Sequence, residues 1–285
     1  MKKRKTGTFY LLMVPVLLWL VVLIVIPHMD MMYRSFRFEA DDGSTLFSLN
    51  NYLAFFKDQI YWLTFVQTAL YSIGVTFLAF VVTFPVAFYL TKVVGKKYSS
   101  FMTMLLLIPI WIGELVTIYG WMILLRDNGV INTFLMKIGL IDSPIEMLFT
   151  NFSMTIGLLY MSMLFMIVPM MSALDSLDDS LIEAASDLGA SKWTIFRQIV
   201  IPYTTPGIAS GGIIVFMLVI GDYVAPNILG GKSSLWFTEQ IYNKFLMSFN
   251  WNEGAAFGFL LLVLSSTIIW IALKLSGQKF EKVGS

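Results

Sequence analysis

The feature that most constrains this chain is a series of apolar segments, each about 20 residues long. A helix needs about 20 mostly apolar residues to cross the hydrocarbon core of a bilayer. Apolar residues make up 58% of the 285-residue chain and charged residues only 13%, whereas about a quarter of the residues in a soluble domain are charged. The chain is therefore predicted to be an all-α polytopic membrane protein with six transmembrane helices, at residues 8–27, 62–90, 101–125, 152–174, 205–228 and 254–275.

The composition argues against several other classes of protein. A formal net charge of +1 does not supply the basic surface that is typical of nucleic-acid binders. With no Cys and one His, the chain lacks the residues for disulfides, thiol catalysis or a multi-His metal site. His28 follows the first apolar segment and is interpreted as an interfacial residue. We therefore expect no nucleic-acid partner and no metal site.

The distribution of Lys and Arg predicts the orientation of the spans. These residues are more frequent in the two tails and in the loops after the second and fourth spans than in the other loops. By the positive-inside rule, both termini are expected in the cytoplasm. The first span is interpreted as an uncleaved helix, because its apolar run is too long for a signal peptide. The expected organisation is a cytoplasmic tail at 1–7, a transmembrane domain at 8–275 and a second tail at 276–285.

The predicted cytoplasmic loop at residues 175–204 departs from this charge rule, because acidic residues outnumber basic ones in it. Ser180 and Glu183 have the spacing of a capping box, which starts a short helix. Gly189 permits the left-handed conformation that ends such a helix. The loop therefore begins with a short capped helix, and its acidity indicates a role other than setting the topology.

A second short helix is expected directly after this turn. Ser191 can cap a helix over residues 192–201, and Pro202 is expected to end it. The local sequence thus predicts a helix–turn–helix elbow before the fifth span. An ordinary capped connector between two spans has the same local pattern, so this alternative stays open at the level of the residues alone.

The elbow resembles the EAA loop of ABC importer permeases, whose pattern is E-A-A-x3-G-x9-I-x-L-P. Ile201 stands where the family usually has Leu, and the other positions match. In that family the elbow docks on the ATP-hydrolysing subunit, so the resemblance implies that the matching residues couple this chain to an ATPase: Glu183, Ala184, Ala185, Gly189, Ile199 and Pro202.

Most of residues 8–275 also resembles the permease subunits of spermidine/putrescine importers. The resemblance is carried by Ile118-Tyr119-Gly120, by the stretch 140–145, by Leu188-Gly189-Ala190-Ser191-Lys192, and by Gly221-Asp222-Tyr223-Val224 followed by Leu229-Gly230-Gly231. It implies the six-helix fold of type I ABC importer permeases in a bacterial cell membrane. The implied partners are a second permease subunit, two copies of an ATP-binding subunit and an external substrate-binding protein.

The resemblance also implies how the chain is energised. The partner ATPase would use ATP with Mg, and no cofactor is expected on this subunit. The sequence contains no G-x-x-x-x-G-K-[ST] motif, so the chain is not expected to hydrolyse ATP itself. It is interpreted as a transporter subunit and not as an enzyme.

Two acidic residues, Glu114 and Asp222, lie within predicted spans that contain no Lys or Arg to pair with them. A carboxylate at membrane depth costs at least about 2.5–3.5 kcal/mol on insertion scales, so such residues usually face a partner or a watery path. On one continuous helix Glu114 would share a face with Trp111 and Trp121, an arrangement that suits an ammonium group through charge pairing and cation–π attraction. Tyr223 adjoins Asp222. These five residues are the predicted substrate pathway.

Other interpretations of these features remain open. Either acid would also be explained by a basic residue of a second subunit, or by protonation in a helix–helix hydrogen bond. The segment 233–251 has an amphipathic pattern and is expected on the outer face, where it would cap the pathway, receive a binding protein or lie at the lipid headgroups. A permease for another small solute, or a secondary transporter or channel, is the alternative function. An intramembrane aspartyl protease is disfavoured because its Gly-x-Gly-Asp motif is missing around Asp222.

Overall fold

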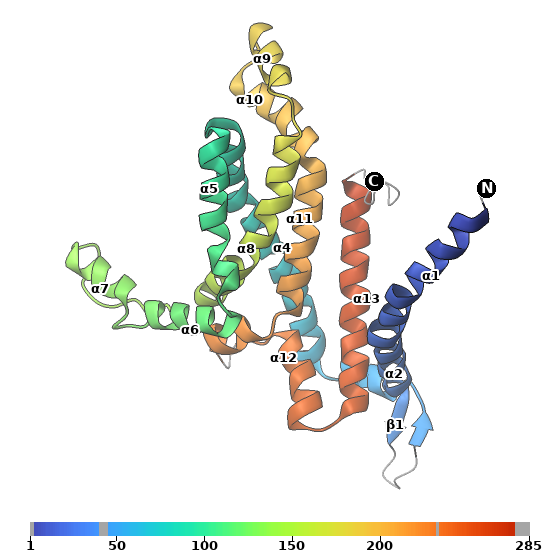
Figure 1. Cartoon of the computed structure of the whole chain (residues 1–285). Coiled ribbons are helices and arrows are strands. Elements are labelled where there is room, and N and C mark those ends of the chain that lie inside the picture. The colour runs from blue at the N-terminus through green and yellow to red at the C-terminus, as the bar shows by residue number, and fades with distance from the viewer. Residues whose placement is uncertain (1–2, 40–44, 232–233, 277–285) are drawn as a thin grey trace. The chain divides into compact units, whose positions relative to one another are not determined.

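The computed structural model describes residues 3–39, 45–231 and 234–276, and this part of the chain is mostly helical (Figure 1). Five helices are long and apolar enough to cross a membrane: Tyr10–Ser35, Gln59–Val93, Asn151–Asp175, Lys192–Gly221 and Trp251–Lys274. A sixth crossing is formed if the bent pair Lys97–Trp111 and Glu114–Lys137 is counted as one span. The predicted class, an all-α polytopic membrane protein, is confirmed. The basic tail residue Lys2 and the tail residues 277–285 lie outside the described residues.

The chain divides into two compact units, each described here by itself. The first comprises Met1–Leu63 and Gln240–Val263. Its elements are α1 (Lys3–Leu20), the π-helical turn η1 (Val21–Val25), α2 (Ile26–Ser35), β1 (Arg37–Glu39), β2 (Thr45–Phe47), α3 (Asn50–Lys57), the start of α4 (Gln59–Phe88), the second half of α12 (Phe237–Tyr242), η7 (Asn243–Met247) and the first half of α13 (Trp251–Leu275). The strands β1 and β2 form an antiparallel hairpin with Phe38 opposite Leu46.

Within this first unit, a buried side chain fixes the link between α2 and the hairpin. The amide of Asn51 donates hydrogen bonds to the carbonyls of Ser35, at 2.9 Å, and Arg37, at 2.7 Å. Lys244 pairs with Glu253 at 2.8 Å and lies over the ring of Tyr61. Burial alone would lower the pKa of Lys244, but its hydrogen bonds to Glu253 and Tyr61 outweigh this effect and raise the pKa. The ammonium group therefore stays charged in this setting.

The second unit comprises Thr64–Glu239 and Leu264–Ser285 and contains the remaining elements. They are the main part of α4 (Gln59–Phe88), η2 (Tyr89–Val93), α5 (Lys96–Leu107), the 3-10 turn η3 (Ile108–Trp111), α6 (Glu114–Leu125), α7 (Val130–Lys137), α8 (Asn151–Asp175), α9 (Asp179–Asp187), α10 (Lys192–Ile195), η4 (Phe196–Val200), α11 (Ile201–Gly221), η5 (Pro226–Gly230), the start of α12 (Phe237–Tyr242) and the end of α13.

The core of this unit is a close contact between α8 and α11, with α4 beside them (Figure 1). A Cβ atom on Gly207 would lie 2.5 Å from both the side chain of Ala173 and the backbone of Pro169. Gly211 likewise faces Met166. Small residues at such positions let two membrane helices approach closely, and packing then replaces the hydrophobic effect as the source of stability. The α8–α11 pair is therefore the rigid centre from which the other elements extend.

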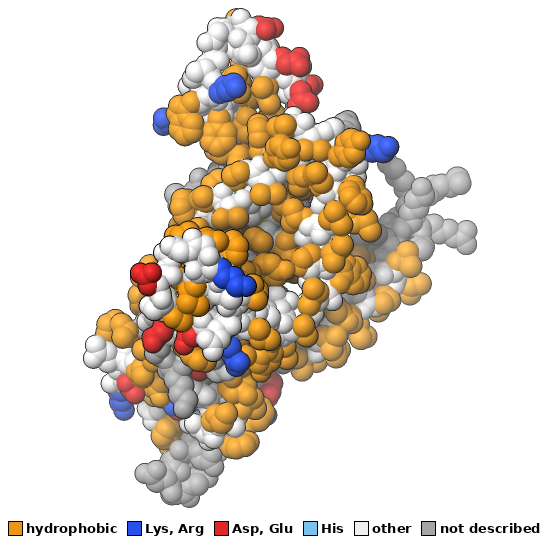
Figure 2. All heavy atoms as spheres, turned by 90° about the vertical axis from the view of Figure 1, so that its left-hand side faces the viewer, with side chains coloured by type: hydrophobic (Ala, Val, Ile, Leu, Met, Phe, Trp, Pro, Cys, Tyr) orange, Lys and Arg blue, Asp and Glu red, His pale blue; other side chains and the backbone are white. Residues whose placement is uncertain are grey.

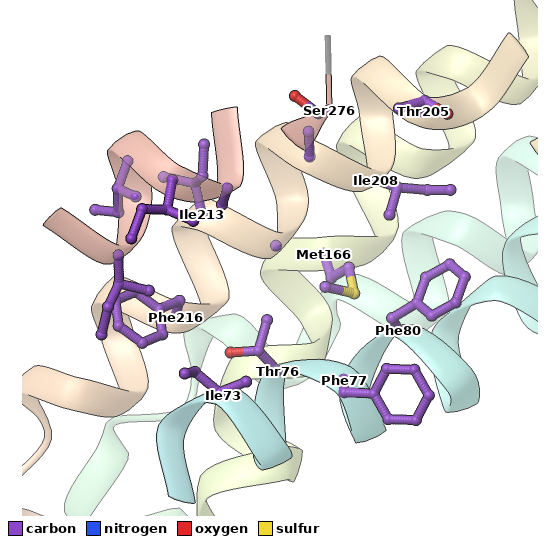
Figure 3. Close-up of a pocket in the computed structure, with 16 residues that line it drawn as sticks. Ile73, Thr76, Phe77, Phe80, Met166, Thr205, Ile208, Ile213, Phe216 and Ser276 are labelled. Carbon is purple, nitrogen blue, oxygen red and sulfur yellow. The ribbon is translucent and has the colours of Figure 1, made fainter. Parts of the chain in front are cut away.

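The surface of the described chain is largely apolar, as expected for contact with lipid (Figure 2). An apolar pocket of about 530 Å³ opens on this surface, between α4, α8, α11 and α13 (Figure 3). Phe77 and Phe80 of α4, Met166 of α8 and Ile208 of α11 line it. None of its lining residues is charged. This pocket suits hydrocarbon, and it is not a site for a charged solute.

Three expected spans differ from the helices in the structure. The expected span 8–27 continues to Ser35, so His28 lies within the helix and not after it. The expected span 101–125 is broken at Ile112 and Gly113, whose extended backbones separate η3 from α6, and its two halves are bent by 94°. Pro109 lacks the N–H that would continue the helix, and Gly113, with φ −59° and ψ 144°, lies outside the helical region. The expected span 205–228 starts earlier, as part of the continuous helix from Lys192, and ends at Gly221.

Candidate functional site: the elbow and the acidic cavity

The elbow begins with α9, whose N-cap is Asp178 and not Ser180 as the capping-box pattern predicts. The Asp178 side chain accepts a hydrogen bond from the backbone N–H of Ser180 at 3.0 Å, which places Ser180 inside the helix. This hydrogen bond holds the pKa of Asp178 below its usual value. The N-cap is Asp178 for a local reason. Asp is as good an N-cap as Ser, and Asp178 stands two residues before Ser180, where its side chain reaches the free N–H groups at the start of α9.

The turn of the elbow forms as the sequence predicts. Gly189 has a φ of +81° directly after α9. The N–H of Ala190 donates to the carbonyl of Ala185 at 3.0 Å, and the N–H of Gly189 donates to that of Ser186 at 2.9 Å. Such paired bonds close a helix through a left-handed residue. Ser191 then caps α10 by accepting from the N–H of Thr194 at 3.2 Å.

The second helix of the elbow does not stop at Pro202. It passes through the wider turn η4 into α11, so Lys192–Gly221 is one continuous helix. In η4 the N–H of Ile201 already bonds five residues back, to the carbonyl of Phe196. Because the backbone pairing is shifted there, the missing N–H and the ring of Pro202 are accommodated in the first turn of α11. The elbow is therefore joined rigidly to a membrane span.

The matched motif residues lie on both faces of the elbow. Glu183, Ala184 and Gly189 are exposed, while Ala185 and Ile199 are half-buried and pack against the core of the unit. Charged side chains gather around α9 and α10 (Figure 2). No described residue covers Glu183, Ala184 and Gly189, so these residues are available for contact with another protein.

The structure adds three residues that the sequence pattern does not single out. Leu188 is 89% exposed and Trp193 67% exposed, which gives the polar elbow a large apolar surface. Lys92, in η2 directly after α4, places its Nζ 2.6 Å from Asp179 Oδ1 and 2.5 Å from the carbonyl oxygen of Leu177. For Leu188 the sequence does contain a signal, because an apolar residue next to Gly189 is unusual in an otherwise acidic loop. No local signal exists for Lys92, because its partners are far along the chain.

The predicted helical face with Glu114 between two indoles is not formed. Trp111 lies in η3, before the break, and is 91% exposed. Glu114 begins α6 after the break, and Trp121 packs against the ring of Tyr160 with centroids 5.5 Å apart. The three residues would share a face only on one continuous helix, and the 94° bend at Ile112 and Gly113 removes that condition.

The two acids Glu114 and Asp222 do meet at one cavity. A cavity of about 440 Å³ is lined by Glu114 of α6 and by Asp222 and Tyr223, which follow the end of α11. The two carboxyl groups therefore border the same space. The other walls are Leu158, Met161, Ser162 and Phe165 of α8, and Leu218, Val219, Gly221 and Val224. The lining contains no basic side chain, so the two acids are not neutralised within it.

Asp222 has a structural role at this cavity as well. Its Oδ1 accepts hydrogen bonds from the N–H groups of Val224, at 2.7 Å, and Ala225, at 3.2 Å, which shapes the chain after α11. Its carbonyl accepts from the hydroxyl of Thr238 at 2.6 Å. Glu114 has no hydrogen bond or ion pair with any other described residue, and it stands at the N-terminus of α6, where the helix dipole favours an acid. Glu114 is thus the more available of the two carboxylates.

The apolar spans, the bent crossing and the capped elbow between two spans describe a multi-pass membrane protein. The chain belongs to the family described as the inner membrane component of binding-protein-dependent transport systems, whose model matches residues 79–282. It is therefore a multi-pass membrane protein and a permease subunit of such a system.

Relatives with specific names share most of the chain. The spermidine/putrescine transport system permease protein PotB of Salmonella typhimurium is 34% identical over 270 residues, which cover 93% of each chain. PotB of Escherichia coli is 33% identical, covering 92% of this chain and 97% of the relative. The permease protein PotC of the Escherichia coli spermidine/putrescine system is 34% identical over 105 residues, 37% of this chain and 39% of the relative.

Solved structures share the fold. The bacterial ABC transporter that imports the acidic polysaccharide alginate matches with a TM-score of 0.74 at 18% identity, covering 99% of this chain and 98% of the other. The same type of transporter, in complex with a periplasmic protein bound to an alginate pentasaccharide, matches with a TM-score of 0.73. The predicted fold of an ABC importer permease is confirmed by this likeness.

Proposed function

We propose that the chain is the permease subunit of an ATP-driven polyamine importer, and that Glu114 and Asp222 bind the amines during translocation. The observation that carries this proposal is that both carboxylates line one cavity that contains no basic side chain. The resemblance of most of the chain to PotB proteins supports spermidine or putrescine as the solute.

The chemistry of the cavity suits a protonated amine. An ammonium group that leaves water needs compensation for its charge and acceptors for its three N–H donors. Two carboxylates supply both, and the repulsion between them is relieved when a cation lies between them. The apolar walls from α8 and α11 suit the methylene segments of a polyamine. Neutral solutes would gain nothing from the two charges.

The energy for import comes from partner subunits in this proposal. Two ATP-binding subunits use ATP with Mg, and one of them receives the exposed residues Glu183, Ala184 and Gly189 of the elbow. A second permease completes the pathway, and an external binding protein delivers the solute. This subunit holds no ATPase site and no cofactor. The elbow and both termini face the cytoplasm in this proposal, in agreement with the larger total of Lys and Arg in the two tails and the loops after the second and fourth spans than in the other loops.

The test removes each charge and keeps its shape. Glu114→Gln and Asp222→Asn retain size and a hydrogen-bonding oxygen, and the amide oxygen introduced by Asp222→Asn can still accept from the N–H of Val224. Each variant should lower uptake of labelled spermidine or putrescine by about ten- to a hundredfold, because a charge-assisted contact contributes roughly 1.5–3 kcal/mol. Uptake is measured in cells or vesicles that contain all subunits.

A matched control separates this role from an assembly role. Glu146→Gln changes an exposed acid in the loop before α8 and should leave uptake unchanged. The amount of assembled complex is measured for each variant, because losing a pairing with another subunit would reduce assembly instead of transport. Full transport by the Glu114→Gln, Asp222→Asn double variant would reject the amine-binding role of both acids.

A further inference from the structure

A second cavity, of about 600 Å³, runs along α5 and η3. Ser99, Thr103, Leu107 and Trp111 line it from one side, each four residues after the last, and Met171 and Asp175 of α8 line the other side. Twelve residues separate Ser99 from Trp111, which corresponds to about 18 Å at 1.5 Å per residue. The cavity is therefore an elongated groove, in which residues of α5 and η3 face the last two turns of α8.

The lining of the groove changes from polar to apolar along its length. Asp175 and the hydroxyl-bearing Ser99 and Thr103 belong to the end near the start of α5. Thr103 donates to the carbonyl of Ser99 at 2.8 Å, so its oxygen keeps acceptor capacity. Leu107 and the exposed indole of Trp111 belong to the other end. Acceptors for N–H groups thus stand next to surfaces for methylene groups.

Asp175 has no evident structural task. It is the last residue of α8, where the helix dipole disfavours a negative charge, and no basic residue lies in the last turn of that helix. The nearby acids Asp178 and Asp179 cap α9 and pair with Lys92, respectively. Asp175 makes no hydrogen bond or ion pair within the part of the chain that the structure describes. Asp175 is thus an exposed carboxylate without a partner in the described chain, and its place in the lining of the groove leaves it available to a cationic ligand.

Two elements connect the groove with the cavity that Glu114 and Asp222 line. Trp111, at one end of the groove, precedes Glu114 by three residues across the break at Ile112 and Gly113. Helix α8 lines both cavities, through Ser162 and Phe165 in the first and Asp175 in the second. The two cavities are therefore lined by successive stretches of α8 and by neighbouring residues on either side of the break.

We propose that this groove is a second binding site for a linear polyamine, in which Asp175 holds an ammonium group and the apolar end holds methylene groups. The inference rests on the proposed function, because it assumes that a polyamine enters the first cavity. It adds a site that a compact cation would not fill, since only a linear chain can reach from Trp111 to Asp175. The second site lowers the cost of leaving Glu114 and Asp222, because it offers the departing amine a new carboxylate.

The test uses the absence of cysteine from the chain. Ser99→Cys places one thiol in the groove of the full transporter, assembled with cysteine-free partner subunits. Its reaction rate is measured with a trimethylammonium-ethyl and a sulfonato-ethyl methanethiosulfonate, which differ in the sign of their charge. The cationic reagent should react severalfold faster than the anionic one because Asp175 attracts it. Spermidine should slow the reaction, and Asp175→Asn should remove both the charge preference and the protection.

Two control variants make the result specific. Asp142→Asn removes an exposed acid from the loop before α8 and should leave both reagent rates unchanged. Asp175→Glu keeps the charge and should retain the protection by spermidine. In transport assays Asp175→Asn should lower spermidine uptake by about tenfold, as expected for one charge-assisted contact.

The outcomes distinguish this inference from the proposed function. If Ser99→Cys reacts at the same rates with and without the Asp175 carboxylate, or if spermidine gives no protection, the groove is not a polyamine site. Loss of uptake in Glu114→Gln and Asp222→Asn alongside normal uptake in Asp175→Asn would overturn the groove alone. Failure of the unaltered transporter to import polyamines would overturn the proposed function itself.

Discussion

At Gly189 the restriction comes from backbone conformation and not from space. Its φ is +81°, and a Cβ atom placed there would meet no other atom within 4 Å. A β-branched residue reaches this left-handed region only with strain of about 1–2 kcal/mol, whereas Asn visits it more readily. The motif glycine therefore shapes the turn between α9 and α10, and any contact with another protein comes from its neighbours.

This distinction predicts different results for two substitutions at Gly189. Gly189→Val should distort the turn and uncouple ATP hydrolysis from uptake, while Gly189→Asn should keep most of the coupling. Uptake and ATPase activity of the assembled transporter are measured together, and their ratio is the readout. Equal, normal ratios in the two variants would show that the turn geometry does not matter for coupling.

The conformation of single residues could be predicted from the sequence where a residue type strongly favours one position, as Gly does at positive φ and Ser does at a helix N-cap. Gly189 and Ser191 act in the turn and as an N-cap, as their identities indicate. The capping-box pattern failed at Ser180, because Asp178 competes for the same N–H groups. The arrangement around Glu114 could not be predicted either. It depends on whether the helix continues through Ile112 and Gly113, and a 3.6-residue periodicity assumes that it does.

At the scale of elements, the elbow is attached to the membrane helices in three ways. It continues into α11 through η4, Phe196 packs against Phe84 of α4 with ring centroids 5.5 Å apart, and Lys92 bridges from the end of α4 to Leu177 and Asp179. The Lys92 side chain is 8% exposed and that of Asp179 71%. The contact with the Leu177 carbonyl is therefore the buried part of the bridge, and the ion pair is its exposed part.

We predict that Lys92 transmits force between the elbow and α4. Lys92→Met keeps the length of the side chain but leaves the Leu177 carbonyl without its donor, which costs about 1 kcal/mol. Uptake per ATP hydrolysed should fall, whereas Lys92→Arg should preserve it. Asp179→Asn should have a small effect, since an exposed ion pair contributes about 0–1 kcal/mol. A normal uptake-to-ATP ratio in Lys92→Met would contradict this role.

Spans were easier to predict than their ends. Five apolar runs became helices because each must satisfy its backbone hydrogen bonds internally in lipid. The third crossing contains Pro109, which signals a break, but the extended conformation of Gly113 and the resulting bend depend on tertiary packing. The fifth ended early because the side chain of Asp222 bonds the N–H groups of Val224 and Ala225 and turns the chain. Long-range partners such as those of Lys92 leave no trace in local sequence.

At the scale of the whole molecule, function requires that the elbow and the acidic cavity belong to different environments. In the proposed function the elbow needs access to an ATPase, and the cavity with Glu114 and Asp222 needs shielding from bulk water. The helix Lys192–Gly221 connects the two, with the elbow at its start and the cavity at its end. At 1.5 Å per residue, its 30 residues span about 45 Å, enough to separate the two sites by a bilayer core of about 30 Å.

This separation predicts the accessibility of single cysteines on the two sides of the membrane. Ser186→Cys lies on the exposed surface of α9 without a capping role, and Ser143→Cys lies in the exposed loop before α8. The chain has no other cysteine, so each thiol reports one position.

A membrane-impermeant maleimide should label Ser143→Cys in intact spheroplasts and Ser186→Cys only after the membrane is opened or inverted. Because α8 crosses the membrane between these positions, the two thiols must face opposite sides. Labelling of Ser186→Cys from outside would place the elbow beyond the reach of a cytoplasmic ATPase and would reject the proposed coupling.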